Sequence, residues 1–543
     1  MLLHSCVTRN LQHVTRNLLC KEVILITRTR IKSGEYYDSV TLLQVAQGLL
    51  DLDGVADAAV VMGTPANKGI LADAELLTPE AETASSDDLV IAVCAESEAT
   101  AEEALEKADV LLEASRTPTE EGGLQQSPKT LAAAVKRMED ANMVLISVAG
   151  RYAAGVAREA LAKGKHVFLF SDNVTVEDEK ALKELGREKG LLVMGPDAGT
   201  AIINGVALGF ANAVISGPVG VVAAAGTGLQ SVTSHLTRMG VGITQGIGTG
   251  GRDLSTEVGG MMMLEGIKAL QAHPKTEVLL LVSKPPAPEV AEKVLKQVQA
   301  SDKPAVVCFL GGDPQMIKDA GGVAAATLEE AAHLAAALAR GEGVDEAIKH
   351  LSQQNVELQA QAEALKKKLS PAQKYFRGLF SGGTLCYETQ VILGKMGFEV
   401  HSNAPVDKAL KMKDSNLSRG HVAVDLGEDE FTVGRLHPML DPTLRNRRIV
   451  REAEDPETAI IFLDVVLGYG AHPDPAGAAA EAIKEAQKVA GAEGREILFL
   501  ASVCGTSGDP QDLDEQEAKL REAGVVVLPT NAAATRLAGY ILD

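Results

Sequence analysis

Two short segments of the sequence place glycine and threonine where a strand ends and a helix begins. They are GPVGVVAAAGTGLQSVTSHL at 217–236 and LFSGGTLCYETQVIL at 379–393. A helix N-terminus presents unpaired backbone N–H groups and the positive end of the helix dipole, and glycine lets an anion approach the backbone closely. The two corners therefore predict phosphate-binding residues, namely Gly226, Thr227, Gly228, Gly382, Gly383 and Thr384.

A purely structural role is the alternative for each corner. In that interpretation the segment is a tight strand-to-helix turn, and its threonine is the N-cap residue of the helix. The occurrence of two such corners in one chain favours anion binding, because two facing helix N-termini can hold one phosphoryl or carboxylate group between them.

Side chains able to bind carboxylates or transfer protons follow other predicted strands. We assign catalytic roles to Arg435 and His437 in GRLHPMLDP and to His472 in GYGAHPDP. Arginine binds carboxylates through paired hydrogen bonds, and histidine transfers protons near neutral pH. A structural loop histidine is the alternative for His437.

Two further loops are expected to contact the substrate. Arg252 follows GIGTGG and binds a carboxylate in one interpretation, whereas it pairs with the adjacent Asp253 in the other. Cys504, Gly505 and Thr506 end the strand-like segment REILFLASVCGT, and we assign them to substrate binding. A nucleophilic role of Cys504 requires a lowered thiol pKa.

Composition restricts the class of protein. A chain of 543 residues with 46% hydrophobic residues and 52 glycines predicts several compact α/β domains. A formal charge of −21, 3% aromatic residues and no tryptophan exclude a nucleic-acid-binding protein, which needs basic surface and stacking side chains. Six scattered cysteines without a CxxC pair indicate a reduced, cytoplasmic protein, and no metal site is expected.

No membrane span is expected either. Residues 198–237 lack Asp, Glu, Lys and Arg, but polar residues and glycines interrupt the segment, whereas a spanning helix needs ~20 predominantly apolar residues. Residues 1–30 contain several arginines and a single acidic residue, Glu22. This composition is typical of a transit peptide or of a start codon assigned too far upstream, and we favour the second.

The elements that must position these loops follow a repeated pattern. Residues 28–115 read as a small α/β domain, and after residue 129 near-continuous apolar strands alternate with helices, which is typical of parallel sheets. Strand, glycine-rich loop and helix recur on both sides of a predicted exposed helix at 341–370, which predicts a duplicated doubly wound fold. In the small domain we expect elements at 38–51, 56–63, 88–95 and 98–114.

Several motifs resemble those of acyl-CoA-forming enzymes. GPVGVVAAAGTGLQSVTSHL, GIGTGGRD and LLVMGPDAG are similar to the α subunit of succinyl-CoA synthetase, and the second half is similar to the ligase domain of its β subunit. The order of motifs most resembles the FdrA proteins, which are acyl-CoA synthetase-like. The specific segments are 431–449, 464–475 and 502–510, and the resemblance covers roughly residues 30 to 540.

The sequence pattern and the resemblance together imply an α/β fold with four domains. These are a small N-terminal α/β sandwich, a Rossmann-like CoA-binding-type domain, and two flavodoxin-like succinyl-CoA-ligase-type domains. The expected boundaries are 1–27 for an extension, 28–115 for the small domain, 129–215 for the CoA-binding-like domain, 216–340 for the first ligase-like domain, 341–373 for a helical linker and 374–543 for the second ligase-like domain.

Three departures separate the chain from the synthetase. The segment LGGDPQMIKDAGGVAAAT, which follows the strand KPAVVCF, contains no histidine, although the synthetase carries phosphate on a histidine of that loop. No segment corresponds to an ATP-grasp domain, and the first glycine-rich loop of the CoA domain has no clear counterpart. Covalent phosphate relay is therefore not expected, ATP-driven ligation requires a partner subunit, and binding of CoA is left open.

The resemblance to FdrA proteins implies an enzyme subunit of purine or allantoin catabolism that transfers an acyl or carbamoyl group to phosphate. An example is conversion of oxalurate and phosphate into carbamoyl phosphate and oxamate. Phosphate is then a substrate, the second substrate is a small carboxylate or ureido compound, and other protein subunits are expected as partners. The alternatives are an acyl-CoA (succinate–CoA) ligase subunit that uses an ATP-grasp partner, and a non-catalytic scaffold.

Overall fold

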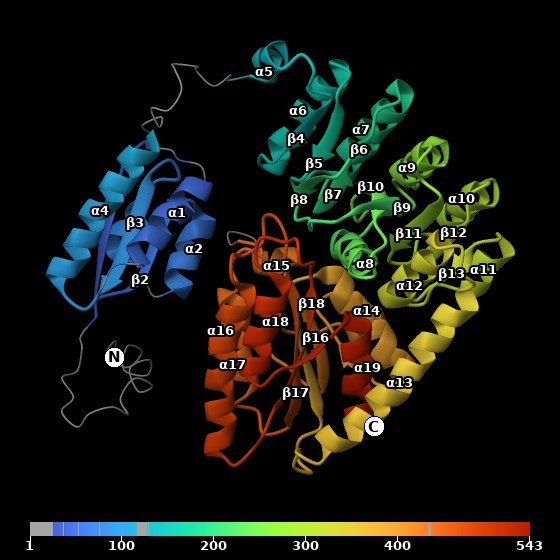
Figure 1. The fold of residues 1–543 in the computed structure, drawn as a ribbon. Coiled ribbons are helices and arrows are strands. Elements are labelled where there is room, and N and C mark those ends of the chain that lie inside the picture. Colours follow the sequence, from blue (N-terminus) through green and yellow to red (C-terminus); the bar gives the residue numbers. More distant parts are fainter. Residues whose placement is uncertain are drawn as a thin grey trace. The chain divides into compact units, whose positions relative to one another are not determined.

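A computed structural model describes residues 25–35, 37, 39–50, 52, 54–74, 76–116, 128, 130–432 and 436–543 (Figure 1). The chain forms two compact units, residues 1–127 and residues 128–543. Most of the predicted extension 1–27 and of the linker near 116–128 lies outside the described residues. Among the described residues, no helix combines the length and apolarity that crossing a membrane requires.

The first unit is a three-stranded antiparallel sheet of order β1-β3-β2 packed on helices. The predicted helices and strands are present, but β1 was not predicted because its sequence, ITRTRIK, alternates with basic residues. These residues pair with acidic residues of α4, for example Arg30 Nη1 with Asp109 Oδ2 at 2.6 Å. The elements are β1 (Ile26–Lys32), α1 (Ser39–Leu50), β2 (Val55–Met62), α2 (Pro65–Asp73), α3 (Pro79–Thr83), β3 (Leu89–Ala95) and α4 (Glu98–Arg116).

The second unit begins with a three-stranded parallel sheet of order β4-β5-β6. A hairpin follows, β7 (Thr200–Ile203) and β8 (Val206–Gly209), and β7 pairs with β10 of the next sheet. Residues from the predicted 129–215 segment thus extend the sheet of the following segment. The preceding elements are α5 (Leu131–Arg137), β4 (Met143–Ile146), α6 (Gly150–Ala162), β5 (His166–Leu169), α7 (Val176–Lys189) and β6 (Val193–Met194).

Two larger sheets share one topology. Five strands of the first sheet, in the order β10-β9-β11-β12-β13, and five of the second, in the order β16-β14-β17-β18-β19, both read 2-1-3-4-5 when these five are numbered along the chain. In the second sheet the short strand β15 adds a sixth strand beside β16. This flavodoxin-like order confirms the duplicated doubly wound fold. The strands are β9 (Ser216–Ala223), β10 (Ile243–Gly248), β11 (Val278–Ser283), β12 (Ala305–Phe309), β13 (Val323–Ala324), β14 (Tyr375–Phe380), β15 (Val400–His401), β16 (His421–Asp425), β17 (Thr458–Val466), β18 (Leu498–Cys504) and β19 (Val526–Leu528).

Helices cover these sheets, and α13 (Val344–Lys366) links the two halves (Figure 1). The sequence predicted α13 to be exposed, but it buries Leu351, Leu358 and Ala362 and packs along α19. The other helices are α8 (Gly226–Arg238), α9 (Met261–Ala272), α10 (Pro288–Gln299), α11 (Pro314–Asp319), α12 (Leu328–Ala339), α14 (Gly383–Lys395), α15 (Asp429–Thr432), α16 (Thr443–Glu452), α17 (Pro475–Ala492), α18 (Leu513–Glu522) and α19 (Asn531–Leu542).

A polar joint fixes the two halves against each other. Asn212 Nδ2 donates hydrogen bonds to the carbonyl oxygen of Leu467 (2.9 Å) and to Asp509 Oδ2 (2.8 Å). The N–H of Ala213 donates to Asp509 Oδ1 at 2.7 Å. Because these groups are buried or nearly so, their loss would leave unsatisfied polar atoms, so the joint fixes the relative position of the halves.

A buried lysine fixes the loop after β10. Lys183 Nζ lies 2.8 Å from Glu179 Oε1 and 2.9 Å from Asp253 Oδ1, and it donates to the carbonyl oxygen of Thr249. The side chains of all three ionic residues are fully buried or nearly so. Asp253 also accepts the N–H groups of Met262 and Met263 at the start of α9. One cation therefore joins α7, this loop and α9.

We expect Lys183→Met to destabilise the second unit by ~3–5 kcal/mol, because the change leaves buried carboxylates without their cation. Chemical denaturation monitored by circular dichroism measures the change. Lys180→Met on the exposed face of α7 is the matched control and should have little effect. Equal stability of the two variants would contradict the structural role of Lys183.

Candidate functional site

Each of the two corners is an uncapped helix N-terminus. Helix α8 begins after N-cap residue Ala225 and α14 begins after N-cap residue Gly382, and neither cap residue makes a side-chain hydrogen bond to its helix. The interpretation of the threonines as N-cap residues is wrong, because Thr227 and Thr384 are the second residues of their helices. The first-turn N–H groups therefore have no capping side chain of their own.

The two corners meet. The N–H of Thr384 donates to Thr227 Oγ1 at 3.3 Å, which joins the first turns of α14 and α8. A methyl group placed on Gly382 would lie 2.8 Å from Thr227 Cγ2, and one on Gly228 would lie 3.0 Å from Thr384 Cγ2. Glycine at these positions lets the first turns of the two helices lie close together, because a larger residue at either would press on the threonine of the other helix.

Both corners open into one cavity of about 650 Å³. It lies at the carboxyl ends of the strands, next to β9 and β14, each the first strand of its 2-1-3-4-5 sheet. Ligands bind at this switch point in doubly wound sheets. The polar and charged lining includes Thr200, Thr227, Gln230, Lys284, Ser381, Thr384, Asp172, Asp197, Asp425, Glu428, Asp429 and His437.

Carboxyl groups and one lysine set the charge of the cavity. Burial raises the pKa of Asp425 to about 7, and the negative charge of nearby Glu428 adds a smaller rise. Burial likewise raises the pKa of Asp197 to about 6, and nearby Asp172 is the second cause. Lys284 is the only lysine or arginine among the described lining residues. Its Nζ lies 5.4 Å from the ring centroid of Tyr387, and it forms no salt bridge within the described part of the chain.

His437, to which the sequence assigned a catalytic role, lines the cavity. Its ring lies 5.4 Å from that of Phe210, and its Nδ1 accepts the N–H of Met439 at 3.2 Å. Burial lowers the pKa of His437 to about 4. The ring is therefore neutral near pH 7 with its proton on Nε2, so it can donate a hydrogen bond to a ligand. Its catalytic role stays a prediction, and Arg435 lies outside the described residues.

Arg252 and His472 do not line the cavity. Arg252 pairs with Glu179 (Nε to Oε2, 3.0 Å) and donates to the carbonyl oxygen of Val174, so its partner is not the adjacent Asp253. His472 Nδ1 accepts the N–H of Asp474 at 3.0 Å. The contacts of both side chains stabilise loops.

Cys504, Gly505 and Thr506 lie at the joint between the halves. Burial raises the pKa of the Cys504 thiol to about 12, which is opposite to what a nucleophile needs. Thr506 Oγ1 donates to the carbonyl oxygen of Ala213 at 2.6 Å, and a methyl group on Gly505 would lie 2.7 Å from Leu467. None of these three residues lines the cavity, and Thr506 joins the halves through its hydrogen bond to Ala213.

Sequence reasoning missed Lys284, Asp197 and Asp425. Lys284 directly follows β11 and Asp425 ends β16, so position at a strand terminus beside the corners was the usable signal. Asp464 on β17, which was also not predicted, holds the backbone that precedes α14. Its carboxylate accepts the N–H groups of Ser381 and Gly382, both at 2.7 Å.

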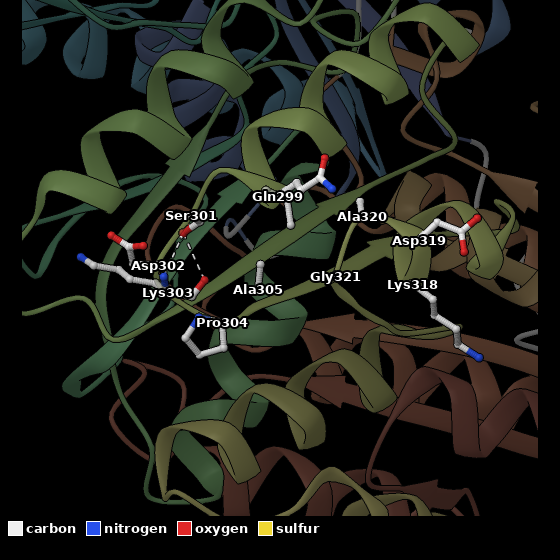
Figure 2. A pocket seen from close by; sticks show the side chains of 11 residues that line it. Gln299, Ser301, Asp302, Lys303, Pro304, Ala305, Lys318, Asp319, Ala320 and Gly321 are labelled. Atoms are coloured by element: carbon white, nitrogen blue, oxygen red, sulfur yellow. Dashed lines mark hydrogen bonds between the residues drawn. The ribbon is translucent and has the colours of Figure 1, made fainter.

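A second hollow, of about 530 Å³, lies at the amino-terminal end of β12 (Figure 2). Its Lys303 Nζ already donates to the carbonyl oxygens of Leu270 and His273, at 2.9 and 2.7 Å. Figure 2 shows Lys318 and Asp319 on the far side of the hollow from Lys303. The hollow therefore lacks polar side chains that converge on one ligand.

Three family models match parts of the chain. The CoA-ligase family matches residues 379–541, and the CoA binding domain family matches residues 216–311. The family described as AllF, heavy metal-associated domain, matches residues 25–129. The predicted domain boundaries stay predictions.

The chain is 46% identical over 508 residues to YahF of Escherichia coli (strain K12), which covers 94% of this chain and 97% of that protein. It is 27% identical over 200 residues to malate–CoA ligase subunit alpha of Methylorubrum extorquens, which covers 35% of this chain and 66% of that protein. Among solved structures, the dinucleotide-forming acetyl-coenzyme A synthetase 1 of Ca. Korarchaeum cryptofilum has a TM-score of 0.31 at 14% identity, covering 74% of this chain and 82% of that one.

Residues 25–129 do not fit a heavy-metal site of the thiolate or imidazole kind. The range contains a single cysteine, Cys94, and no histidine. Soft metal ions are held by several such ligands together. In the described part of the chain, no group of three or more His, Cys, Asp or Glu side chains is arranged to hold a metal ion.

We expect Asp425→Asn to raise the melting temperature at pH 8 by ~2–4 °C. The pKa of Asp425 is raised in the folded protein, so ionisation destabilises the fold. This cost is full above pH 7 and decreases progressively as the pH falls from 7 towards the ordinary aspartate pKa of about 4. Calorimetry at pH 8 and pH 5 tests this. Asp172→Asn, at an exposed carboxylate of the same cavity, is the control. An equal gain at both pH values would contradict the assigned cause.

Proposed function

The chain belongs to the FdrA family of acyl-CoA synthetase-like proteins, and from this premise we propose that it is a subunit of a phosphate-using acyl or carbamoyl transferase. In the proposed reaction, inorganic phosphate attacks the ureido carbon of oxalurate. A C–O bond forms, the C–N bond to the oxamate nitrogen breaks, and that nitrogen gains a proton. The products are carbamoyl phosphate and oxamate. Other protein subunits are proposed as partners.

The observation that carries this proposal is the convergence of two uncapped helix N-termini on one cavity. Their first turns are joined by the hydrogen bond between Thr384 and Thr227, and Lys284 lines the same space. Helix N-termini stabilise anions through free N–H groups and the helix dipole, and a lysine adds a full positive charge. Such a site holds phosphate against the negative charge of a carboxylate substrate.

The loop after β12 supports direct attack by phosphate rather than relay through the protein. It runs through Asp313, which accepts the N–H of Gln315 and caps α11. No histidine occurs between 310 and 327. A phosphohistidine intermediate needs a nucleophilic imidazole at this place, and this loop has none.

The second candidate is an acyl-CoA ligase subunit that works with an ATP-grasp partner. The matches to the CoA-ligase and CoA binding domain families and to malate–CoA ligase subunit alpha favour it. A non-catalytic scaffold that holds such partners is the third candidate.

One assay separates these candidates. The chain, purified with its partner subunits, is incubated with oxalurate and phosphate in the absence of nucleotide and CoA. Release of carbamoyl phosphate supports the transferase. Thioester formation that requires ATP and CoA would replace it with the ligase, and absence of both activities would favour the scaffold.

We expect Lys284→Met to weaken phosphate binding by about tenfold or more, since a charge-assisted contact contributes ~1.5–3 kcal/mol. Isothermal titration calorimetry of the full chain with inorganic phosphate measures the change. Lys293→Met, at an exposed lysine of α10, is the matched control and should bind as the unchanged chain does. Thr227→Val should also weaken binding, because it removes the hydroxyl that joins the corners. Unchanged affinity in both variants would contradict the proposed phosphate site.

A further inference from the structure

Asp425 is held rigidly at the wall of the cavity with one carboxyl oxygen unused. Its backbone N–H and carbonyl are both bonded to the side chain of Asn403, at 2.9 and 2.8 Å. Its Oδ1 accepts the N–H of Gly427 at 2.9 Å. Among the described residues no hydrogen-bond donor reaches Oδ2, although the residue is only 3% exposed.

The unused oxygen lies where an anion would approach α14. A methyl group placed on Gly383, the first residue of α14, would lie 2.4 Å from Asp425 Oδ2. An anion bound at this helix start is therefore a close neighbour of the carboxyl group. Two negative charges at such a distance repel strongly in a buried site, and the repulsion is relieved when the carboxyl group takes up a proton.

The charged and titratable groups around Asp425 come from several elements, and among them Asp425 is the carboxyl group beside the start of α14. Lys284, in the loop after β11, faces it with a positive charge, whereas Glu428 and Asp464 face it with negative charges. Burial raises the pKa of the Cys386 thiol on α14, so that thiol is neutral. His437 Nε2 lies near Gly427, 2.8 Å from where a methyl group on that glycine would be, so both side chains reach the same space.

We propose that Asp425 takes up a proton when phosphate enters the cavity and donates that proton to the leaving nitrogen of the acyl or carbamoyl substrate. This assignment rests on the proposed function. It extends that function by naming a proton donor for the leaving nitrogen.

The proposed step is balanced in atoms and charge. An oxygen of hydrogenphosphate bonds to the carbonyl carbon, and the C–N bond breaks with its electron pair moving to nitrogen. The proton of the Asp425 carboxyl group moves to that nitrogen, and Asp425 remains as a carboxylate. When the next phosphate ion binds, its negative charge again favours the protonated form of Asp425, which takes the proton from solvent.

The raised pKa of Asp425, about 7, supports this role, because a general acid is most effective when its pKa is near the working pH. Glu388, five residues after Gly383 on α14, provides a comparison. Burial also raises its pKa to about 7, but its oxygens accept the N–H of Leu328 (2.7 Å) and Asn531 Nδ2 (2.8 Å). Glu388 does not line the cavity, so it has no ligand to protonate.

Calorimetric titration of the full chain with sodium sulfate at pH 7.5, in two buffers of different ionisation enthalpy, measures proton uptake on binding. Sulfate does not titrate in this range, so the protons taken up belong to the protein. We expect the unchanged chain and Glu388→Gln to take up about half a proton or more per sulfate bound. Asp425→Asn should bind sulfate at least as tightly and lose at least half of that uptake.

The outcomes separate the inference from the proposed function. Equal proton uptake in Asp425→Asn and the unchanged chain overturns the inference alone and transfers the protonation to another carboxyl group such as Asp197. Absence of binding of both phosphate and sulfate to the unchanged chain overturns the proposed function as well. A second measurement needs no variant: sulfate affinity should fall by up to tenfold per pH unit above pH 7, and a constant affinity overturns the inference.

Turnover of the complex gives the remaining test. In the complex with its partner subunits, Asp425→Asn should lower kcat for carbamoyl transfer by about 100-fold or more while KM for phosphate stays constant or falls. Loss of affinity for phosphate with constant kcat would instead assign Asp425 to anion binding and overturn its role as proton donor.

Discussion

Two helix N-termini that face each other without capping side chains are the constraint from which the rest of this structure follows. Each carries unpaired N–H groups and the positive end of a dipole, so their mutual approach is unfavourable unless negative charge lies between or beside them. In this chain the first turns of α8 and α14 are joined through Thr227 and Thr384, and carboxyl groups surround the space in front of them. The cavity is therefore a place where negative charge is both needed and supplied.

The scaffold keeps the two termini in this position. Identical strand orders place both corners at the carboxyl edge of their sheets, beside the first strand. The joint of Asn212 and Asp509 then fixes one sheet against the other, and Asp464 fixes the second corner from beneath. Buried hydrogen bonds to a carboxylate are specific in geometry, because removing one partner leaves a buried polar or charged atom without compensation.

The same arrangement makes ionisation of the carboxyl groups in the cavity unfavourable. Burial raises the pKa of Asp425 to about 7 and that of Asp197 to about 6, so their charged forms oppose folding near neutral pH. For stability alone, apolar residues or ion-paired carboxylates would be better at these buried positions. Such costs are typical of sites where a proton or an anion is exchanged.

Local patterns predict the strand-to-helix corners at 226–228 and 382–384, and the alternation of strands and helices predicts the duplicated doubly wound fold. The catalytic role assigned to His437 from the sequence stays a prediction, although the side chain lines the cavity. Contacts between distant segments bring Lys284 and Asp425 to the corners, pair Arg252 with Glu179, and place Cys504 in the joint between the halves. The physical reason is that helix starts and strand ends are set by neighbouring residues, whereas burial, pKa and salt-bridge partners are set by which distant segments come into contact.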